Sequence, residues 1–282
     1  MLPYIDLGFT RISLYGPIFL LGFALAMIII RSIAKKTPVE RSHLLYAAIY
    51  GLIGLAIGAK VLFFFTRLPS IIQNWDDYVK IFKADYETAL DIAFGGLVFY
   101  GGLIGFALGV IRYSVHFKVD LFDLTDLYSP FLPFAHAFGR IGCFLSGCCY
   151  GIEYHGPFSV QFPYNEISPE LSEVPRFPVQ LLEALLNFIC FGVLLMILLK
   201  AIKQKPDERK LKKGQLLGYY LAYYIVARTG LEFLRGDVVR GKIGFLSTSQ
   251  IISILLIPVA AVLIKAHNRT VVFYKSEEKL IN

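Results

Sequence analysis

Seven apolar segments long enough to cross a lipid bilayer constrain this sequence more than any other feature. A helix of about 20 predominantly apolar residues spans the hydrocarbon core of a membrane. The segments occupy residues 14–33, 44–66, 95–115, 121–147, 178–200, 214–234 and 248–266. Backbone polar groups in lipid must be satisfied within the protein, and single segments achieve this as helices. The sequence therefore predicts an all-α polytopic membrane protein, with residues 1–282 forming a single transmembrane domain of seven helices.

The composition agrees with this class. The chain is 56% hydrophobic and 17% charged, whereas soluble domains average about 45–50% apolar and about 25% charged residues.

Two long connections, residues 67–94 and 150–177, are predicted outer loops, and the second is expected to form a small outer head region. Within the first, "SIIQNWDDYVKIF" (70–82) fits either an amphipathic helix at the membrane interface or an ordinary loop.

The fourth apolar segment is the least regular. It is interrupted by Asp123, Asp126, Pro130 and Pro133. Charged residues and prolines disfavour a continuous helix in hydrocarbon, so we expect its first turns at the membrane interface.

Lysine and arginine residues are distributed unequally between the two sides of the predicted domain. The connections and the chain end that follow odd-numbered segments carry 17 of them, and the opposite side carries 8. Because cytoplasmic loops are enriched in basic residues, the N-terminus is expected outside and the tail 267–282 in the cytoplasm. The net charge of +7 is then a topology signal, and no nucleic-acid partner is expected.

Besides Asp123, Asp126 and the basic residues counted above, a few charged residues fall inside the apolar segments or at their ends. They are the bases Lys60, Arg140 and Arg228 and the acids Glu183 and Glu232. A charge at the bilayer centre costs at least about 2.5–3.5 kcal/mol, so such residues usually mark a functional site. Ion pairs that only join helices are the alternative interpretation.

Three arginines are predicted to converge near the outer surface. Arg228, Glu232 and Arg235 are spaced i, i+4 and i+7, which places them on one face of the sixth helix. Arg140 lies at the outer end of the fourth segment, beside small glycines. Guanidinium groups bind phosphate through paired hydrogen bonds and stay charged. We therefore expect an anionic phospholipid headgroup as ligand, with Glu232 pairing with Arg228.

Several motifs also carry a family resemblance. In chain order they are "LYGPIF" (14–19), "LLYAAIYGLIGLAIGAKVLFF" (44–64), "GGLVFYGGLIG" (95–105), "GRIGCFLSGCCYG" (139–151), "RFPVQLLEALL" (176–186), "YIVARTGLEFLRGD" (224–237) and "STSQIISI" (247–254). Their order and spacing resemble those of the bacterial prolipoprotein diacylglyceryl transferases. Any one motif is weak, but the resemblance covers most of the chain.

This resemblance implies a function. A member of the family transfers diacylglyceryl from phosphatidylglycerol to the lipobox cysteine thiol of a preprolipoprotein, the first step of lipoprotein maturation. The implied partners are phosphatidylglycerol, the lipobox peptide and membrane lipids. The implied location is the bacterial cytoplasmic membrane, with the active site toward the outer leaflet. Neither a cofactor nor a metal is expected.

The resemblance also assigns roles to individual residues. The catalytic candidates are Tyr100, Arg140, Cys148, Arg228 and Glu232. The candidates for substrate binding are Tyr15, Lys60, Cys143, Gln180, Tyr224 and Arg235. Four positions depart from the family pattern: Lys60 stands where an arginine is usual, Tyr100 replaces a histidine, Cys143 an asparagine and Cys148 a glutamate. These departures indicate a divergent branch.

The clustered cysteines have three open interpretations. Cys143, Cys148 and Cys149 could be small packing residues, a redox or acyl-accepting thiol set activated by Arg140, or metal ligands together with His136.

Other functions also stay open at this stage. They are a phospholipid-dependent transferase with another acceptor, a membrane thiol oxidoreductase, and a non-enzymatic lipid-binding or transport protein. Inverted repeats with broken helices would favour a transporter, and we find no internal repeat in the sequence. A trapped mixed disulfide would favour the oxidoreductase.

Overall fold

The computed structural model describes residues 4–6, 11–37, 39–96, 98–164, 171–204, 211–236, 242–243 and 246–265. The predicted tail 267–282 lies outside these residues. The chain forms two compact units. One unit comprises residues 39–124, and the other joins residues 1–38 to residues 125–282.

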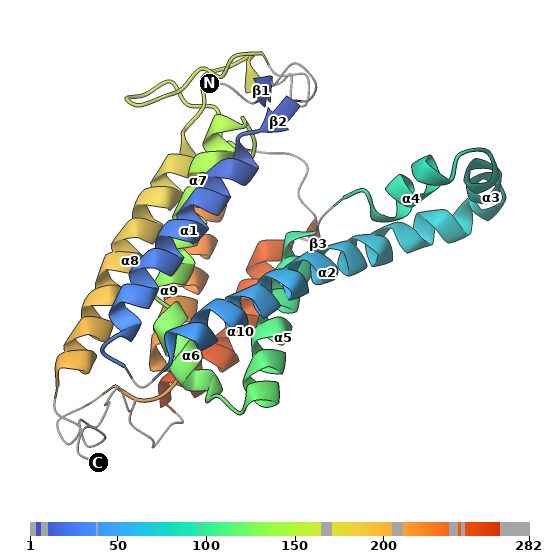
Figure 1. Ribbon diagram of the computed structural model, residues 1–282. Coiled ribbons are helices and arrows are strands. Elements are labelled where there is room, and N and C mark those ends of the chain that lie inside the picture. Colours follow the sequence, from blue (N-terminus) through green and yellow to red (C-terminus); the bar gives the residue numbers. More distant parts are fainter. Residues whose placement is uncertain are drawn as a thin grey trace. The chain divides into compact units, whose positions relative to one another are not determined.

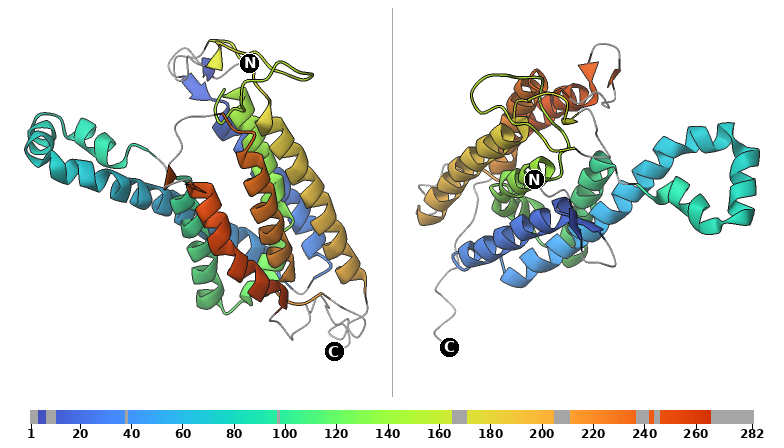
Figure 2. Two further views of the ribbon diagram at one scale, coloured as in Figure 1. Left: turned by 180° about the vertical axis from the view of Figure 1, so that it is seen from behind. Right: turned by 90° about the horizontal axis from the view of Figure 1, so that it is seen from above.

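The larger unit is built from long helices, with one strand pair before α1 and another between α9 and α10. Its elements are β1 (Tyr4–Asp6), β2 (Arg11–Ser13), α1 (Tyr15–Ala34), α7 (Phe131–Leu145), α8 (Val179–Lys203), α9 (Gln215–Glu232), β3 (Lys242–Ile243), β4 (Leu246–Ser247) and α10 (Thr248–Lys265). Helix α7 packs against α1 and α8 (Figure 1), and α9 packs against α8 and α10 (Figure 2). Each strand pair is antiparallel, with Ile5 opposite Ile12 and Ile243 opposite Leu246.

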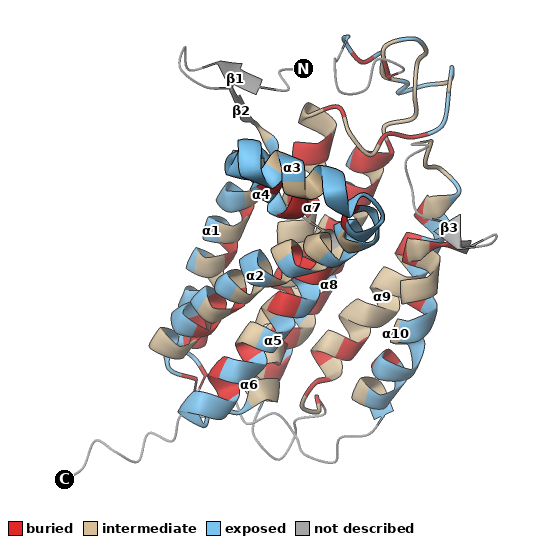
Figure 3. Ribbon diagram, turned by 90° about the vertical axis from the view of Figure 1, so that its right-hand side faces the viewer, coloured by how far each residue is buried: buried red, intermediate tan, exposed pale blue. Residues whose placement is uncertain are grey.

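Helix α7 is the most enclosed long helix of this unit. None of its 15 residues is exposed (Figure 3). Small residues permit this packing. A Cβ added at Gly142 would lie only 3.2 Å from the Cα atom of Tyr15 at the start of α1. Residues on α7 are therefore held between two neighbouring helices, and Arg140 is among them.

The smaller unit contains α2 (Arg41–Gln73), α3 (Trp75–Ala84), α4 (Tyr86–Phe94) and α5 (Phe99–Phe117). Helices α2 and α5 pack backbone to backbone. A Cβ added at Gly54 or Gly58 would overlap the carbonyl oxygen of Gly105 or Gly101 on the facing helix. This close approach follows from glycines at four-residue spacing on both helices, a pattern typical of membrane helix pairs.

Four described helices are long and apolar enough to cross a membrane: α1, α2, α8 and α10. Large apolar side chains face outward from them, among them Ile28, Ile57 and Leu185, each more than half exposed. Soluble proteins rarely expose large contiguous apolar surfaces. The protein is therefore a helical membrane protein.

One predicted connection and one predicted membrane segment differ from the observed structure. Residues 67–94 form the end of α2 and the helices α3 and α4, so this predicted outer loop is helical. The apolar spacing of residues 70–82 thus reflects helix, and Asp85 caps α4 by accepting hydrogen bonds from the backbone N–H groups of Glu87 and Thr88. The fourth apolar segment is divided into α6 (Leu121–Tyr128) and α7, because Pro130 interrupts the helical hydrogen bonding.

Candidate active site

The first half of the site is a polar network of three residues between α7 and α8, in which Arg140 and Glu183 form an ion pair. Glu183 binds Arg140 through Oε2, 3.0 Å from Nε, and approaches His136 through Oε1, 3.3 Å from Nε2. His136 and Arg140 lie one turn apart on α7, with Arg140 Nε also 3.3 Å from His136 Nε2. The side chain of Glu183 is only 4% exposed. A buried carboxylate thus fixes the orientation of the Arg140 guanidinium group.

The second half of the site lies on α9. Arg228 Nη2 is 2.9 Å from Glu232 Oε2, which confirms the pairing predicted from their i, i+4 spacing. The hydroxyl of Ser249 at the start of α10 donates to the same carboxylate oxygen at 3.0 Å. Arg228 is 7% exposed, and its Nη1 atom is buried without a hydrogen-bond partner among the described residues. A buried guanidinium nitrogen without a partner is costly, and an anionic ligand would satisfy it.

The local charge balance is positive. Glu183 lies within electrostatic range of Arg228 as well as at salt-bridge distance from Arg140. Arg235 acts on Arg228 from the end of α9. Among these residues three guanidinium groups face two carboxylates, so the group as a whole favours an anion.

The turn after α7 places two cysteines beside each other. Gly147 adopts the left-handed conformation at φ 67°. Its N–H bonds to Phe144 O, and the N–H of Cys148 bonds to Cys143 O at 3.0 Å. These two hydrogen bonds define a Schellman motif. The helix therefore ends by folding Cys148 back toward Cys143.

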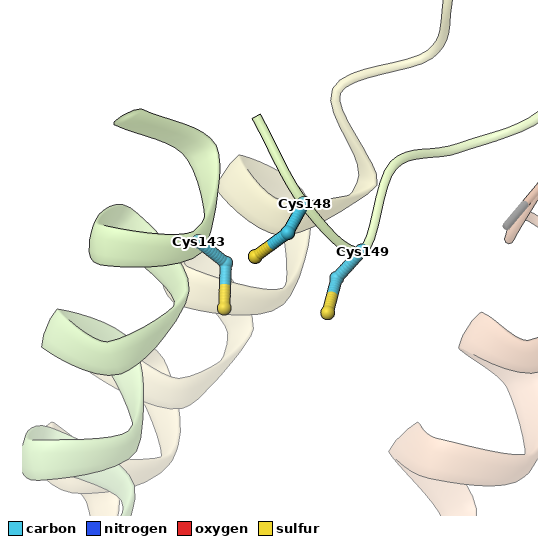
Figure 4. Close-up of side chains that lie close together, drawn as sticks. All are labelled: Cys143, Cys148 and Cys149. Carbon is cyan, nitrogen blue, oxygen red and sulfur yellow. The ribbon is translucent and has the colours of Figure 1, made fainter. Parts of the chain in front are cut away.

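Cys149 completes a group of three thiols. Its φ of 57° lies in the left-handed region, which a residue with a Cβ rarely adopts. The Sγ atoms of Cys143, Cys148 and Cys149 lie within 4.8 Å of one another (Figure 4). Hydrogen bonds from the Cys143 and Cys148 thiols lower the pKa of the Cys149 thiol, and Arg140 and Arg235 lower it further. Desolvation opposes these effects.

Hydrogen bonds tie the cysteine turn, residues 146–151, to the Gln180 side chain on α8 and to the backbone of the segment that follows α9. Gln180 Nε2 donates to Cys148 O at 2.8 Å, and the side chain of Gln180 is fully buried. The N–H of Gly236 donates to Tyr150 O at 3.1 Å, and Gly151 pairs with Arg235. The segment after α9 therefore carries Arg235 to the thiols.

A small hydrophobic cluster supports the head region above the site. Tyr150, Phe162 and Leu171 are buried together. The Arg176 guanidinium carbon lies 4.5 Å from the centre of the Tyr150 ring. Residues 165–170 of the predicted head lie outside the described residues.

The remaining predicted site residues fall in two places. Tyr15 lies beside Gly142 and Gly139, and the Tyr224 ring centre is 6.3 Å from that of His136, so both border the larger unit's site. Tyr100 is on α5 and Lys60 on α2, both in the smaller unit. Lys60 Nζ donates to the carbonyl oxygen of Phe94 at 2.5 Å, where it caps the end of α4.

Three residues that border the site are absent from the predicted site residues: His136, Glu183 and Ser249. Glu183 was noted as a charge within an apolar segment, but its pairing with Arg140 joins separate helices and has no sequence spacing to reveal it. His136 was considered only as a metal ligand and instead contacts Glu183. Apart from its place in the motif 247–254, nothing in the sequence indicates that Ser249 contacts the site.

The chain is similar in sequence to known proteins along most of its length. The sequence profile of the family described as prolipoprotein diacylglyceryl transferase matches residues 3–266. The chain belongs to this family. Two relatives in Clostridium tetani and Clostridium perfringens carry the name phosphatidylglycerol–prolipoprotein diacylglyceryl transferase, the second with the suffix 2.

The similarity to these transferases extends along nearly the whole chain. The Clostridium tetani transferase is 34% identical over 243 residues, which are 86% of this chain and 88% of the relative. The Clostridium perfringens transferase is 33% identical over 247 residues, 88% of each chain. A transferase of Aeromonas hydrophila is 30% identical over 263 residues, 92% of this chain and 87% of the relative.

Proposed function

We propose that the protein transfers the diacylglyceryl group of phosphatidylglycerol to the lipobox cysteine thiol of a preprolipoprotein. Membership of the transferase family supports this reaction. The observation that carries it to particular residues is the buried Nη1 atom of Arg228, which has no described hydrogen-bond partner and faces a local excess of positive charge. A phosphodiester headgroup supplies both the acceptor oxygen and the negative charge.

The chemistry needs stabilisation of a leaving phosphate. The substrate thiolate sulfur attacks the diacylglyceryl carbon, a C–S bond forms, and the C–O bond to phosphate breaks. The phosphate oxygen keeps the electron pair and leaves as glycerol phosphate. Arg140 and Arg228, fixed by Glu183 and Glu232, are in place to bind that oxygen before the reaction begins. Preorganised cations of this kind contribute most when charge develops in the transition state.

Four more residues are assigned to substrate binding because of where they lie in the larger unit. Arg235 contributes to headgroup binding, since it is drawn toward Cys149 by the pairing with Gly151. Tyr15, Gln180 and Tyr224 border the same region and bind substrate.

The positions where this chain departs from its family also receive roles. Cys143 in the last turn of α7 and Cys148 in the turn that follows take part in binding and activating the acceptor. Tyr100 and Lys60, from the smaller unit, are assigned to the reaction and to substrate binding by their places in the family motifs.

We further propose a seven-helix topology with the N-terminus outside and the C-terminus in the cytoplasm. Helices α5, α7 and α9 would cross the membrane in addition to the four apolar helices, because they match the remaining apolar segments. The excess of basic residues in the connections after odd-numbered segments supports this orientation. The site then faces the outer leaflet.

Purified protein, phosphatidylglycerol vesicles and a lipobox peptide provide the test. We expect the peptide to gain the mass of one diacylglyceryl group through a thioether that resists hydroxylamine. A peptide with serine in place of the cysteine should stay unmodified. An unmodified cysteine peptide, or a product that neutral hydroxylamine converts back to the free cysteine peptide, would refute the proposal.

A further inference from the structure

We propose that Cys143, Cys148 and Cys149 bind a zinc ion and that its fourth coordination position takes the substrate thiol. The first part concerns a metal site and stands on the geometry of the thiols. The second part rests on the proposed function, because it assigns the ion the task of activating the acceptor.

The separation of the sulfur atoms fits a common metal ion. All three Sγ atoms lie within 4.8 Å of one another. Zinc binds thiolate sulfur at about 2.3 Å, so two sulfurs of a tetrahedral site are about 3.8 Å apart. Small rotations of the cysteine side chains reach that spacing from the observed one. In Figure 4 the three sulfurs project into the same space from α7 and the turn that follows it.

The backbone holds the two adjacent cysteines in a conformation that suits shared coordination. Neighbouring residues in an extended chain point to opposite sides. Here Cys149 adopts a φ of 57°, and the Schellman motif anchors Cys148 to the end of α7. Gln180 Nε2 holds the carbonyl oxygen of Cys148 from α8. Strained backbone of this kind persists where the surrounding structure requires it, and it is enriched at functional sites.

The fourth position is open to a substrate. Within the part of the chain that the structure describes, no histidine, aspartate or glutamate side chain completes the thiol group. His136 instead contacts Glu183 at 3.3 Å. Structural zinc sites almost always have four protein ligands, whereas catalytic sites have three and leave the fourth for water or substrate.

The charges near the thiols favour such a complex. Three thiolates and one zinc ion carry a net charge of −1, and a bound substrate thiolate makes it −2. Arg140 and Arg235 both act electrostatically on Cys149. The same arginines that attract a phosphate would therefore also stabilise the metal–thiolate group, which brings nucleophile and leaving group to one place.

The ion would supply the nucleophile without a protein base. Binding to zinc deprotonates the substrate thiol, and the proton passes to water. The bound sulfur then attacks the diacylglyceryl carbon and forms the C–S bond while the C–O bond to phosphate breaks. Nothing is oxidised or reduced. The thioether product is a weaker ligand than the thiolate, so it leaves and frees the position for the next thiol. This chemistry would compensate for tyrosine at position 100.

Metal content tests the site itself. Full-length protein purified in detergent without added metal should contain about one zinc ion per chain, as three-cysteine sites do. The variant Cys149→Ser should lose most of it, and so should a triple serine variant at the three positions. Cys190→Ser is the matched control, since Cys190 is a buried free cysteine of α8 outside the group. Equal zinc in all four proteins, or stoichiometric copper in place of zinc, would overturn the proposal.

Cobalt substitution tests the open position without requiring turnover. Protein loaded with Co²⁺ should show a sulfur-to-cobalt charge-transfer band. Adding a lipobox peptide in the absence of phosphatidylglycerol should intensify that band, because a fourth thiolate binds. A serine peptide should leave it unchanged. An unchanged band with the cysteine peptide would reduce the site to a structural one and overturn the catalytic part.

The two proposals can fail separately. Zinc binding and a thiol-dependent cobalt spectrum without any lipid transfer would support the metal site and refute the proposed function. Transfer that persists in protein stripped of zinc by a chelator would support the proposed function and refute the catalytic part of the metal proposal. If both hold, the chelator should lower the transfer rate at least about tenfold and added zinc should restore it.

Discussion

The carboxylate of Glu183 binds Arg140 at 3.0 Å and His136 at 3.3 Å, so one acid on α8 organises two bases one turn apart on α7. Removing one partner of a buried ion pair leaves an uncompensated charge, at a cost of about 3–5 kcal/mol. The substitution Glu183→Gln should therefore lower the thermal unfolding midpoint and reduce transfer. Glu153→Gln is the control, because its pair with His155 is largely exposed and such pairs contribute at most about 1 kcal/mol. Equal stability of the two variants would contradict this role.

Substitution of Arg228 should lower the transfer rate by more than the loss of one positive charge alone would. Its Nη2 is occupied by Glu232, and its Nη1 is available for the headgroup. Loss of one preorganised donor costs about 10²–10³ in rate, so Arg228→Ala and Arg140→Ala should each lower the transfer rate by this factor. Lysine at either position should restore little, because an ammonium lacks the planar fork.

Arg67→Ala provides the comparison for these variants. Arg67 is exposed and lies over the Phe63 ring, so its loss should leave the rate nearly unchanged. Comparable losses in Arg67→Ala and Arg228→Ala would show a nonspecific effect of positive charge.

Gly151 should tolerate no side chain. A Cβ there would overlap the carbonyl oxygen of Phe177 and lie 3.0 Å from that of Leu234. Because both neighbours are backbone atoms, Gly151→Ala should separate the cysteine turn from Arg235 and lower both stability and activity. Gly192→Ala on α8 has open space around its Cβ and should be neutral or stabilise by up to about 1 kcal/mol. Thermal unfolding of both variants gives the answer, and matched midpoints would contradict the observed packing.

In protein stripped of metal, the rate at which maleimide alkylates Cys149 should depend only weakly on pH. Its pKa is lowered by hydrogen bonds from Cys143 and Cys148. A lowered pKa moves the pH at which alkylation levels off to a lower value, so the alkylation rate of Cys149 should rise less steeply between about pH 6 and 8 than that of an ordinary thiol. An ordinary thiol with a pKa near 8.5 should react roughly tenfold faster per pH unit over most of that range. Peptide mapping after a pH series measures the rate, and an ordinary pH slope at Cys149 would be inconsistent with the thiol network.

The proposed orientation predicts opposite reporter signals in two loops. A reporter fused after residue 207 should be cytoplasmic, and one fused after residue 165 should be outside. Both fusions depend on the bias of 17 basic residues against 8. Reversed signals would move the site to the inner leaflet.

Much of the fold could be predicted because membranes restrict the choices. Long apolar segments must be helical in lipid, and residues 14–33, 178–200 and 248–266 correspond closely to α1, α8 and α10. The pairing of Arg228 with Glu232 also followed from helical spacing. Local periodicity was sufficient in each case.

Contacts between residues of separate helices could not be predicted from local spacing. The bond between Arg140 and Glu183 depends on how α7 packs against α8, which no local spacing encodes. The grouping of Cys149 with Cys143 depends on a left-handed φ at a residue other than glycine, which propensity disfavours. The apolar spacing of residues 70–82 fits a helix as well as a loop, and the packing of α4 against α2 and α3, which favours the helix, is not visible in the sequence.

The most direct test of the central claim follows the atoms of the headgroup. Purified protein, phosphatidylglycerol and a lipobox peptide should be incubated in ¹⁸O-labelled water, and both products should be measured by mass spectrometry. Direct attack by the thiol on the diacylglyceryl carbon predicts equal amounts of thioether peptide and glycerol phosphate, with no label in the glycerol phosphate. In Arg228→Ala both products should fall together. Labelled glycerol phosphate, or its release without thioether, would show hydrolysis of the phospholipid and contradict diacylglyceryl transfer.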